Sequence, residues 1–484
     1  MKTIEQSTAS TDSVLEPSSD ELRQMIELAT DHLVRFLEAL PEMPLDGTAS
    51  GAELARSLVE AMPTQGAALD ELLNLLFEQV IPCSYNTAGG GYLAYIPGGG
   101  LPQSGVAELI SNVVNRYITV WVASPAFIQL ETNVIRWLCD MMKFPESAGG
   151  YLSSGGSMAN FTALVTARCE RLPENFLDGV LYASDQVHHS VLKAAKLAGF
   201  PGKNVRSMPS DATFRIRLDL LEQQLEEDRS AGRRPFLIVG NAGSTNTGAV
   251  DDLDAMAELA ARHKLWFHVD GAYGGFFQLT ERGRHRLRGI ERADSVTLDP
   301  HKGLFLPYGT GCLLVRDRAA LHRTHGMDAD YMPTTQDDLD FVDFCEISPE
   351  LSRDCRGLRI WLPMKMVGAD AFRDQLDEKI DLARFATDQL RAMADIEIVA
   401  EPQLSLVVFR WAPPGLEAEA LNRLNQDLLA AINRRQRVLM TSTLVAGNRY
   451  VLRICVLSFR THREHLDMAL EDIRAAMAEL ASSP

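Results

Sequence analysis

The spacing of apolar residues along the chain changes in a way that separates different kinds of secondary structure. Over residues 20–80, apolar positions recur at helical spacing, as in "ELRQMIELATDHLVRFLEAL" and "ALDELLNLLFEQVI", which predicts helices. From about 105 to 320, short apolar runs such as "GVLYAS", "FLIVGNAG", "LWFHVDGA" and "SVTLDP" alternate with segments of helical period such as "LDAMAELAARH". Strand–helix–strand alternation predicts an α/β fold with a mostly parallel sheet between helices.

The last part of the chain has a different pattern. A long helical period covers about 354–394, and it is followed by the apolar runs "IEIVAE" and "LSLVVFRW". A helix is predicted at 417–435, then the strand "RYVLRICVL", and then a final helix at 462–481. This order predicts a small C-terminal α+β domain.

Three parts follow from these patterns. Residues 1–100 form a helical N-terminal segment, whose first residues, 1–18, are polar and predicted to be flexible. Residues 101–360 form the large α/β domain, and residues 361–484 form the small domain. Inside the large domain, the segment 326–350 is rich in Asp and has no basic residue, which predicts a mobile loop.

Composition and charge exclude several classes of function. The net charge of the 484-residue chain is −18, which argues against binding to nucleic acid or to anionic membranes. The seven cysteines are dispersed with no CxxC pair, which indicates a reduced, cytoplasmic protein without a metal site. No apolar run reaches the roughly 18–20 residues that span a bilayer, and the polar N-terminus does not resemble a signal peptide.

A glycine-containing loop enters a predicted helix in "YLSSGGSMAN". Ser154, Gly155, Gly156 and Ser157 would place backbone N–H groups and a hydroxyl at the helix N-terminus, which suits a phosphate. The same residues are also typical of an ordinary helix N-cap that follows a glycine turn. Asp270 closes the apolar run of "LWFHVDGA"; it is either a carboxylate facing a ligand or a turn-initiating Asp.

Two further polar positions follow predicted strands. In "DSVTLDPHKG", Lys302 would lie beside Asp270 if the two strands are neighbours, although a solvated lysine is the common alternative. In "YASDQVHHS", either His188 or His189 could face the same crevice or be structural. One chemistry uses all four elements, because pyridoxal 5′-phosphate (PLP) needs a phosphate cradle, a carboxylate at its ring nitrogen, a lysine and a flat group against its ring.

At these residues the sequence resembles the group II PLP-dependent decarboxylases, which include the aromatic L-amino-acid, histidine and glutamate decarboxylases. The motifs "SGGSMAN", "DQVHHS", "GSTNTGAVDDL", "HVDGAYGG" and "DPHKG" occur in order. The resemblance implies the fold type I transferase architecture, with a seven-stranded, mostly parallel sheet. It also implies a homodimer in which the helices of residues 1–100 wrap the partner and each site is lined by both subunits. The implied activity is that of a carboxy-lyase in amino acid metabolism, releasing CO2 and a primary amine from an L-amino acid with an aromatic or bulky side chain.

The resemblance also implies roles for single residues. The substrate amine would displace Lys302 from a Schiff base with the cofactor, with Asp270 at the pyridine nitrogen and His188 stacked on the ring. These three are the implied catalytic residues. The implied cofactor-binding set adds the phosphate loop, the ring contacts and the neighbour of the lysine: Gly155, Gly156, Ser157, Thr245, Ala272 and His301.

Several positions depart from the family pattern. The family often has Asn where this chain has Asp299, and a carboxylate there would repel a phosphate. Tyr95 and Trp121 are expected to shape the substrate pocket. The loop usually carries a tyrosine that protonates the carbanion, but "DDLDFVDFCEIS" has Phe341 and Phe344 instead.

These departures leave three functions open. Protonation of the carbanion would give the amine, which is the favoured prediction. Without the phenol, oxygen could intercept the carbanion and give an aldehyde, so an oxidative deaminase is the second. A PLP-binding protein without catalysis is the third, and the joint presence of Lys302, Asp270 and His188 argues against it.

Overall fold

The computed structural model describes residues 15–327 and 341–482. These residues divide into two compact units, one ending at Gly89 and the other beginning at Gly90, and each is described by itself. Most of the predicted mobile loop, residues 328–340, lies outside the described residues. The predicted division at 100 and 360 stays a prediction.

The first unit is built from helices. Its first helix begins with a capping box, because Ser18 Oγ accepts from the N–H of Glu21 (3.2 Å) and Glu21 Oε2 accepts from the N–H of Ser18 (2.7 Å). His32 packs against Phe77 with ring centroids 5.0 Å apart, while apolar side chains such as Leu33 remain exposed. The α-helices of this unit are α1 (Ser19–Ala39), α2 (Gly51–Ser57) and α3 (Leu69–Leu75).

The second unit contains a seven-stranded sheet in the order β1-β7-β6-β5-β4-β2-β3. Strands β2 to β6 pair in parallel, whereas β7 is antiparallel to both of its neighbours. The segment that joins β6 to β7 contains one short helical turn, and β7 runs back antiparallel to β6. The strands are β1 (Gly149–Ser153), β2 (Gly179–Ser184), β3 (Val205–Met208), β4 (Arg234–Asn241), β5 (Trp266–Gly271), β6 (Ser295–Leu298) and β7 (Gly311–Val315).

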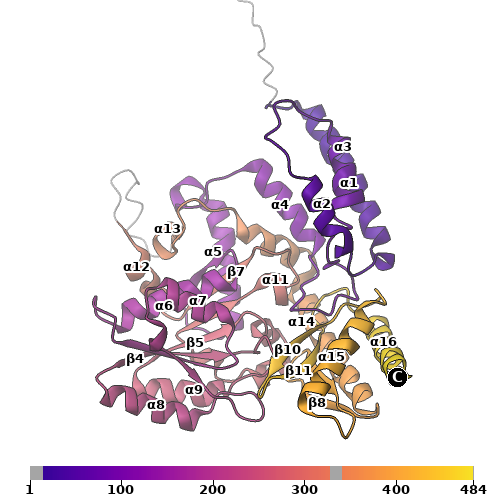
Figure 1. The fold of residues 1–484 in the computed structure, drawn as a ribbon. Helices are drawn as coiled ribbons and strands as arrows, with labels where there is room; N and C mark the ends of the chain where they lie inside the picture. The colour runs from indigo at the N-terminus through magenta and orange to yellow at the C-terminus, as the bar shows by residue number, and fades with distance from the viewer. Residues whose placement is uncertain (1–14, 328–340, 483–484) are drawn as a thin grey trace, which may run out of the picture. The chain divides into compact units, whose positions relative to one another are not determined.

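Helices cover both faces of this sheet, with α6 and α7 on one side and α8 and α9 on the other (Figure 1). Alternate residues of β4 point to opposite faces. Leu237 and Val239 join the core that includes Ala163 of α6, whereas Ile238 joins the core that includes Leu221 of α8. The helices are α4 (Pro102–Val114), α5 (Pro125–Met141), α6 (Gly156–Arg171), α7 (His189–Leu197), α8 (Leu218–Ser230), α9 (Leu253–His263), α10 (Glu281–Arg286), α11 (Pro300–Gly303), α12 (Ala319–His325) and α13 (Phe344–Ile347).

A second, four-stranded antiparallel sheet follows, in the order β10-β11-β9-β8. The long helix that leads to it is kinked, because Gly368 has a φ of 79°. The predicted small α+β region is therefore present at the C-terminal end. Its elements are α14 (Arg356–Arg391), β8 (Ile396–Ala400), β9 (Leu406–Trp411), α15 (Ala418–Asn433), β10 (Thr441–Val445), β11 (Arg449–Cys455) and α16 (Arg463–Ser482).

The predicted α/β class with a mostly parallel sheet is confirmed. Within the described residues, no helix has both the length and the apolar character needed to cross a bilayer.

Candidate active site

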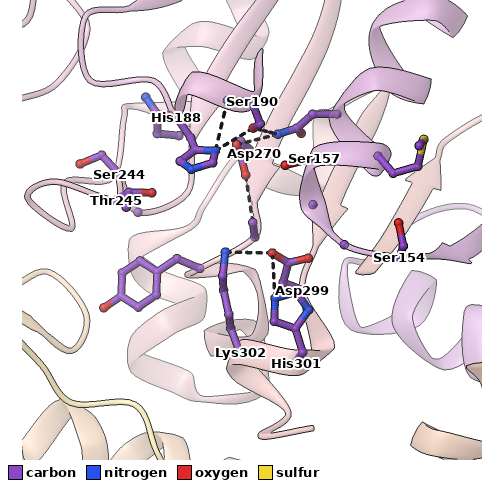
Figure 2. A pocket seen from close by; sticks show the side chains of 18 residues that line it. Ser154, Ser157, His188, Ser190, Ser244, Thr245, Asp270, Asp299, His301 and Lys302 are labelled. Atoms are coloured by element: carbon purple, nitrogen blue, oxygen red, sulfur yellow. Dashed lines mark hydrogen bonds and ion pairs between the residues drawn. The ribbon is translucent and has the colours of Figure 1, made fainter. Parts of the chain in front are cut away.

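Polar residues gather where the parallel strands end. The carboxyl ends of neighbouring parallel strands meet at one edge of a sheet, which is where open α/β sheets bind ligands. The segments that follow β1, β2, β4, β5 and β6 together line one cavity of about 280 Å³ (Figure 2). Strands β5 and β6 pair directly, and both Asp270 and Lys302 line this cavity.

The turn from β1 into α6 forms one wall of this cavity. Gly155 has a φ of 154° and a ψ of 170°, a conformation that favours glycine. Ser153 Oγ accepts from the N–H of Gly155 at 3.3 Å and so fixes the turn. The helix then begins at Gly156, and its first N–H groups have no partner within the helix. Ser154, Gly155, Gly156 and Ser157 all line the cavity, as an anion cradle requires.

Asp270 is held by a chain of buried hydrogen bonds. Asn160 Nδ2 donates to Asp270 Oδ2 at 3.0 Å, and the N–H of Ala272 donates to Asp270 Oδ1 at 3.1 Å. Behind Asn160, its Oδ1 lies 3.0 Å from His268 Nε2, and His268 Nδ1 lies 2.8 Å from Ser295 Oγ. This chain holds the carboxylate in one orientation, at the edge of the cavity.

His188 is connected to the same chain. It caps α7, and its Nδ1 accepts from the N–H of Ser190 at 3.3 Å and lies 2.7 Å from Ser190 Oγ. Asn160 Nδ2 in turn donates to Ser190 Oγ at 2.9 Å. Because Nδ1 accepts, the neutral ring carries its proton on Nε2. Burial lowers the pKa of His188, an effect partly offset by Asp270, so the ring is neutral at neutral pH.

Asn160 is the last residue of the motif "SGGSMAN" and was not among the site residues predicted from the sequence. It lies four residues after Gly156, so one helical turn places it on the same face of α6 as the start of the helix. It is buried and binds both Asp270 and Ser190. The spacing of four residues between Gly156 and Asn160 is the feature of the sequence from which this role could have been predicted.

Replacing Asn160 with alanine is expected to lower kcat/KM by about 10- to 100-fold. A hydrogen bond to a charged group contributes about 1.5–3 kcal/mol, and each 1.36 kcal/mol corresponds to a factor of ten. The pH–rate profile should also change, because the substitution removes the hydrogen bond from Asn160 to Ser190, which contacts His188. Cys169→Ala, at an exposed position of the same helix, is the control. Equal rates for the Asn160→Ala and Cys169→Ala enzymes would contradict the positioning role.

The buried His268 makes folding stability depend on pH. Burial lowers the pKa of His268 from 6.5 to about 4, so the unfolded chain takes up a proton at a higher pH than the folded chain. This contribution to stability is fully present above pH 6.5 and is lost as the pH falls toward 4. Urea midpoints between pH 7 and 4.5 measure the loss. His268→Gln should show a shallower pH dependence, and an unchanged slope would contradict the assignment.

Lys302 lies on α11, and its ammonium pairs with a buried carboxylate. Lys302 Nζ is 2.8 Å from Asp299 Oδ2, and His301 Nε2 is 3.6 Å from the same oxygen. His301 Nδ1 is fixed by the carbonyl oxygen of Thr310 at 2.7 Å. No role for Asp299 follows from the sequence, and the structure places this residue in the lining of the cavity.

The loop after β4 brings Thr245 to the cavity wall. A buried arginine of the small sheet holds this loop, because Arg453 Nη2 donates to the carbonyl oxygen of Thr245 at 2.6 Å and Nε donates to that of Asn246 at 3.1 Å. Arg453 therefore fixes the main chain that carries Thr245.

The four residues predicted to bind substrate do not line the cavity formed by the described residues. Tyr95 is exposed, and the rings of Trp121 and Phe341 pack together with centroids 4.0 Å apart. Phe344 is buried under the guanidinium of Arg353, 4.2 Å from its ring centroid. Their contact with substrate stays a prediction.

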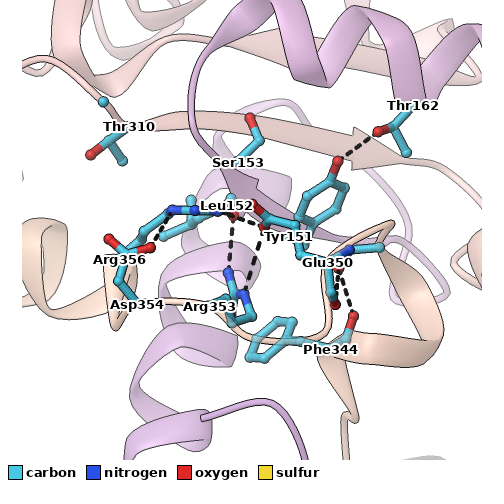
Figure 3. Close-up of polar contacts among 12 residues, drawn as sticks. Tyr151, Leu152, Ser153, Thr162, Thr310, Phe344, Glu350, Arg353, Asp354 and Arg356 are labelled. Carbon is cyan, nitrogen blue, oxygen red and sulfur yellow. Dashed lines mark hydrogen bonds and ion pairs between the residues drawn. The ribbon is translucent and has the colours of Figure 1, made fainter. Parts of the chain in front are cut away.

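Two buried arginines support the strand that precedes the cradle (Figure 3). Arg353 Nη2 and Arg356 Nη1 each donate to the carbonyl oxygen of Leu152 at 2.9 Å. Arg353 also forms a fully buried ion pair with Glu131 at 2.6 Å. Arg353 therefore fastens the end of β1 to α5.

The residues present fit a phosphate-bearing pyridine aldehyde. The start of α6 offers N–H groups and the Ser157 hydroxyl to a phosphate, and Lys302 offers an amine. Asp270 offers a fixed carboxylate for a ring nitrogen, and His188 offers a flat neutral ring. The exception is Asp299, a carboxylate close to the cradle.

Comparisons with known proteins agree with this geometry. Residues 56–412 match the pyridoxal-dependent decarboxylase conserved domain. The chain is 36% identical to an aromatic-L-amino-acid decarboxylase of Bacillus atrophaeus, over 97% of this chain and 98% of that protein. The structure of Oryza sativa TDC with PLP and tryptamine has a TM-score of 0.90 and 27% identity, covering 96% of this chain and 99% of that one. That of Catharanthus roseus tryptophan decarboxylase with L-tryptophan has a TM-score of 0.88 and 28% identity, with the same coverage. The predicted fold, cofactor and enzyme class are confirmed, and the chain belongs to the family of PLP-dependent decarboxylases.

Proposed function

We propose that this decarboxylase acts on an aromatic L-amino acid and releases the primary amine and CO2. The observation that supports the substrate class is the 36% identity to an aromatic-L-amino-acid decarboxylase over nearly the whole chain. The cavity supports the chemistry, because it brings together Lys302, Asp270 and His188 beside an anion cradle.

Each residue of the cavity has a proposed task. The bound cofactor withdraws the electron pair that remains when the bond from Cα to the carboxylate breaks. Lys302 supplies the amine that holds the cofactor. Asp270, fixed by Asn160, keeps a proton at the ring nitrogen. His188 would offer the flat face of its ring to the cofactor, and its Nε2–H can donate to the substrate.

The remaining cofactor contacts are proposed on the same basis. Gly155, Gly156 and Ser157 would bind the phosphate at the start of α6, and Thr245 and Ala272 line the same cavity. His301, which also lines it, lies beside the lysine. Orientation within a preformed site is the main contribution of such residues to rate.

A second product is favoured by the described part of the loop. Phe341 and Phe344 carry no hydroxyl, so neither can donate a proton to Cα. If O2 takes the electron pair instead, the substrate, O2 and water give aldehyde, CO2, ammonia and hydrogen peroxide. We place amine formation first because a neutral His188 can supply the proton.

The experiment is a screen of the common amino acids, with DOPA, ornithine and diaminobutyrate included, that scores CO2, amine and peroxide together. Amine equal to CO2, with aromatic substrates preferred, is expected. Aldehyde and peroxide in place of amine would establish the second product, and Phe341→Tyr and Phe344→Tyr should then shift the ratio toward amine. No turnover of any aromatic substrate would refute the proposed substrate class.

We also propose that the enzyme is a homodimer in the cytoplasm. Helix α4 exposes apolar side chains at helical spacing (Val106, Leu109, Ile110 and Val113), which suits burial against a second copy. All seven cysteines lie among the described residues and are unpaired, as is usual in a reducing compartment. Sedimentation velocity should give twice the mass of the chain, whereas a fully active monomer would contradict the dimer.

A further inference from the structure

Asp299 is a buried carboxylate that does not cap its own helix. It occupies the N-cap position of α11, but its side chain makes no capping hydrogen bond there. Its Oδ2 pairs with Lys302 at 2.8 Å, while its Oδ1 is buried and has no hydrogen-bond partner among the described residues. A buried carboxylate with an unused oxygen is costly unless another group binds it.

That carboxylate lies directly against the anion cradle. A Cβ on Gly156 would come within 2.9 Å of Asp299 Oδ2 and 3.2 Å of Oδ1. A Cβ on Gly155 would lie 3.7 Å from Cε1 of His301. Asp299 and His301 therefore border the N–H groups at the start of α6, where a phosphate would bind (Figure 2).

Among the titratable groups that face Asp299, the Nε2 atom of His301 is the position that can accept a proton. From neighbouring elements, His188 is neutral because burial lowers its pKa, and the Cys312 thiol of β7 is neutral because burial raises its pKa. On its own turn, Asp299 faces Lys302 and His301. The carbonyl oxygen of Thr310 can only accept, so His301 Nδ1 carries a proton and the Nε2 lone pair of the neutral ring faces Asp299.

Cofactor loading changes this balance of charge. When the cofactor binds, its phosphate would bring negative charge into the cradle, beside the carboxylate of Asp299. We propose that loading is coupled to the uptake of one proton from solvent by the cluster of Asp299, His301 and the phosphate. This inference rests on the proposed cofactor contacts, and it predicts that Asp299 makes cofactor affinity fall as the pH rises.

The test compares the wild type with Asp299→Asn, which removes the charge and keeps the shape. Apoenzyme is titrated with PLP at pH 6.5, 7.5 and 8.5, and the dissociation constant is read from the absorption band at about 400–430 nm. Pyridoxal, which has no phosphate, is titrated in parallel. No substrate is present, so the result does not depend on which amino acid the enzyme uses.

The ratio of the wild-type to the variant dissociation constant for PLP should rise about tenfold per pH unit, as one proton requires. The same ratio for pyridoxal should stay nearly constant. The proposal would be overturned if the dissociation constant for PLP changed with pH equally in the wild type and the variant. It would also be overturned if the ratio for pyridoxal rose with pH as much as the ratio for PLP, because an effect that does not need the phosphate would act through Lys302 alone. A wild type without the absorption band would overturn the lysine assignment as well.

Calorimetry on the wild type alone gives a second test that does not need the variant to fold. Binding heats in two buffers of different ionisation enthalpy give the number of protons taken up. PLP should take up one more proton than pyridoxal at pH 8, and equal proton uptake would overturn the proposal.

Discussion

Replacing Lys302 with alanine is expected to abolish decarboxylation and to remove the absorption band at about 400–430 nm. The amine of this side chain is the group that holds the cofactor, so turnover should fall by at least about a thousandfold, or about 4 kcal/mol of transition-state stabilisation. Spectra and CO2 release from the same preparation measure both effects. Lys196→Ala, at an exposed position of α7, is the matched control.

The ion pair with Asp299 calls for a second variant. Lys302→Ala leaves a buried carboxylate without its partner, so a loss of activity could reflect a disturbed fold. Lys302→Arg keeps a positive charge beside Asp299 but offers no primary amine. It should also lack the band and the activity while keeping the thermal midpoint of the apoenzyme near that of the wild type. A band or appreciable turnover in either variant would refute the assignment.

The strands and helices that form the site could be predicted because they carry a strong pattern. The apolar runs that become β4 and β5 are six to eight residues long and fully or almost fully buried. Runs of this kind, alternating with helical periods, indicate a parallel sheet without any tertiary information. The polar residues directly after such runs then predicted that Lys302 would lie beside Asp270 if their two strands were neighbours.

Elements with weak patterns could not be predicted. Strand β1 contains two glycines, β3 is a four-residue edge strand that is mostly half-buried, and the side chains of β10 are mostly half-exposed. Each becomes a strand because a neighbour supplies the hydrogen bonds, which is tertiary information that no local propensity records.

The contacts around the site were also outside the reach of the sequence. Asn160 and His268 lie 108 residues apart in the chain and meet only because α6 packs across β5. Lys302 and Asp299 are close in sequence, but the orientation of Asp299 toward the cradle depends on Gly156, which belongs to another element. Pairings of this kind follow from the fold and not from spacing.

Removing the buried charge of Arg353 is expected to cost the protein much of its stability. Both Arg353 and Glu131 have fully buried side chains, with Nη2 and Oε1 2.6 Å apart. Arg353→Met leaves the Glu131 charge unpaired, which typically costs about 3–5 kcal/mol of unfolding free energy. Urea denaturation of the apoenzyme measures the loss. Arg423→Met, which breaks an exposed pair with Glu419 at 3.0 Å, should have a much smaller effect.

The double variant Arg353→Met with Glu131→Gln separates the charge from the packing. Glutamine can still accept the hydrogen bond that the N–H of Gly357 gives to Glu131 at 3.0 Å, and it leaves no buried charge. The double variant should therefore be more stable than Arg353→Met alone. Because Arg353 also holds the carbonyl oxygen of Leu152, two residues before Ser154, both variants should bind PLP more weakly than the wild type. An Arg353→Met protein with wild-type urea midpoint and PLP affinity would show that Arg356 alone is enough to hold the end of β1.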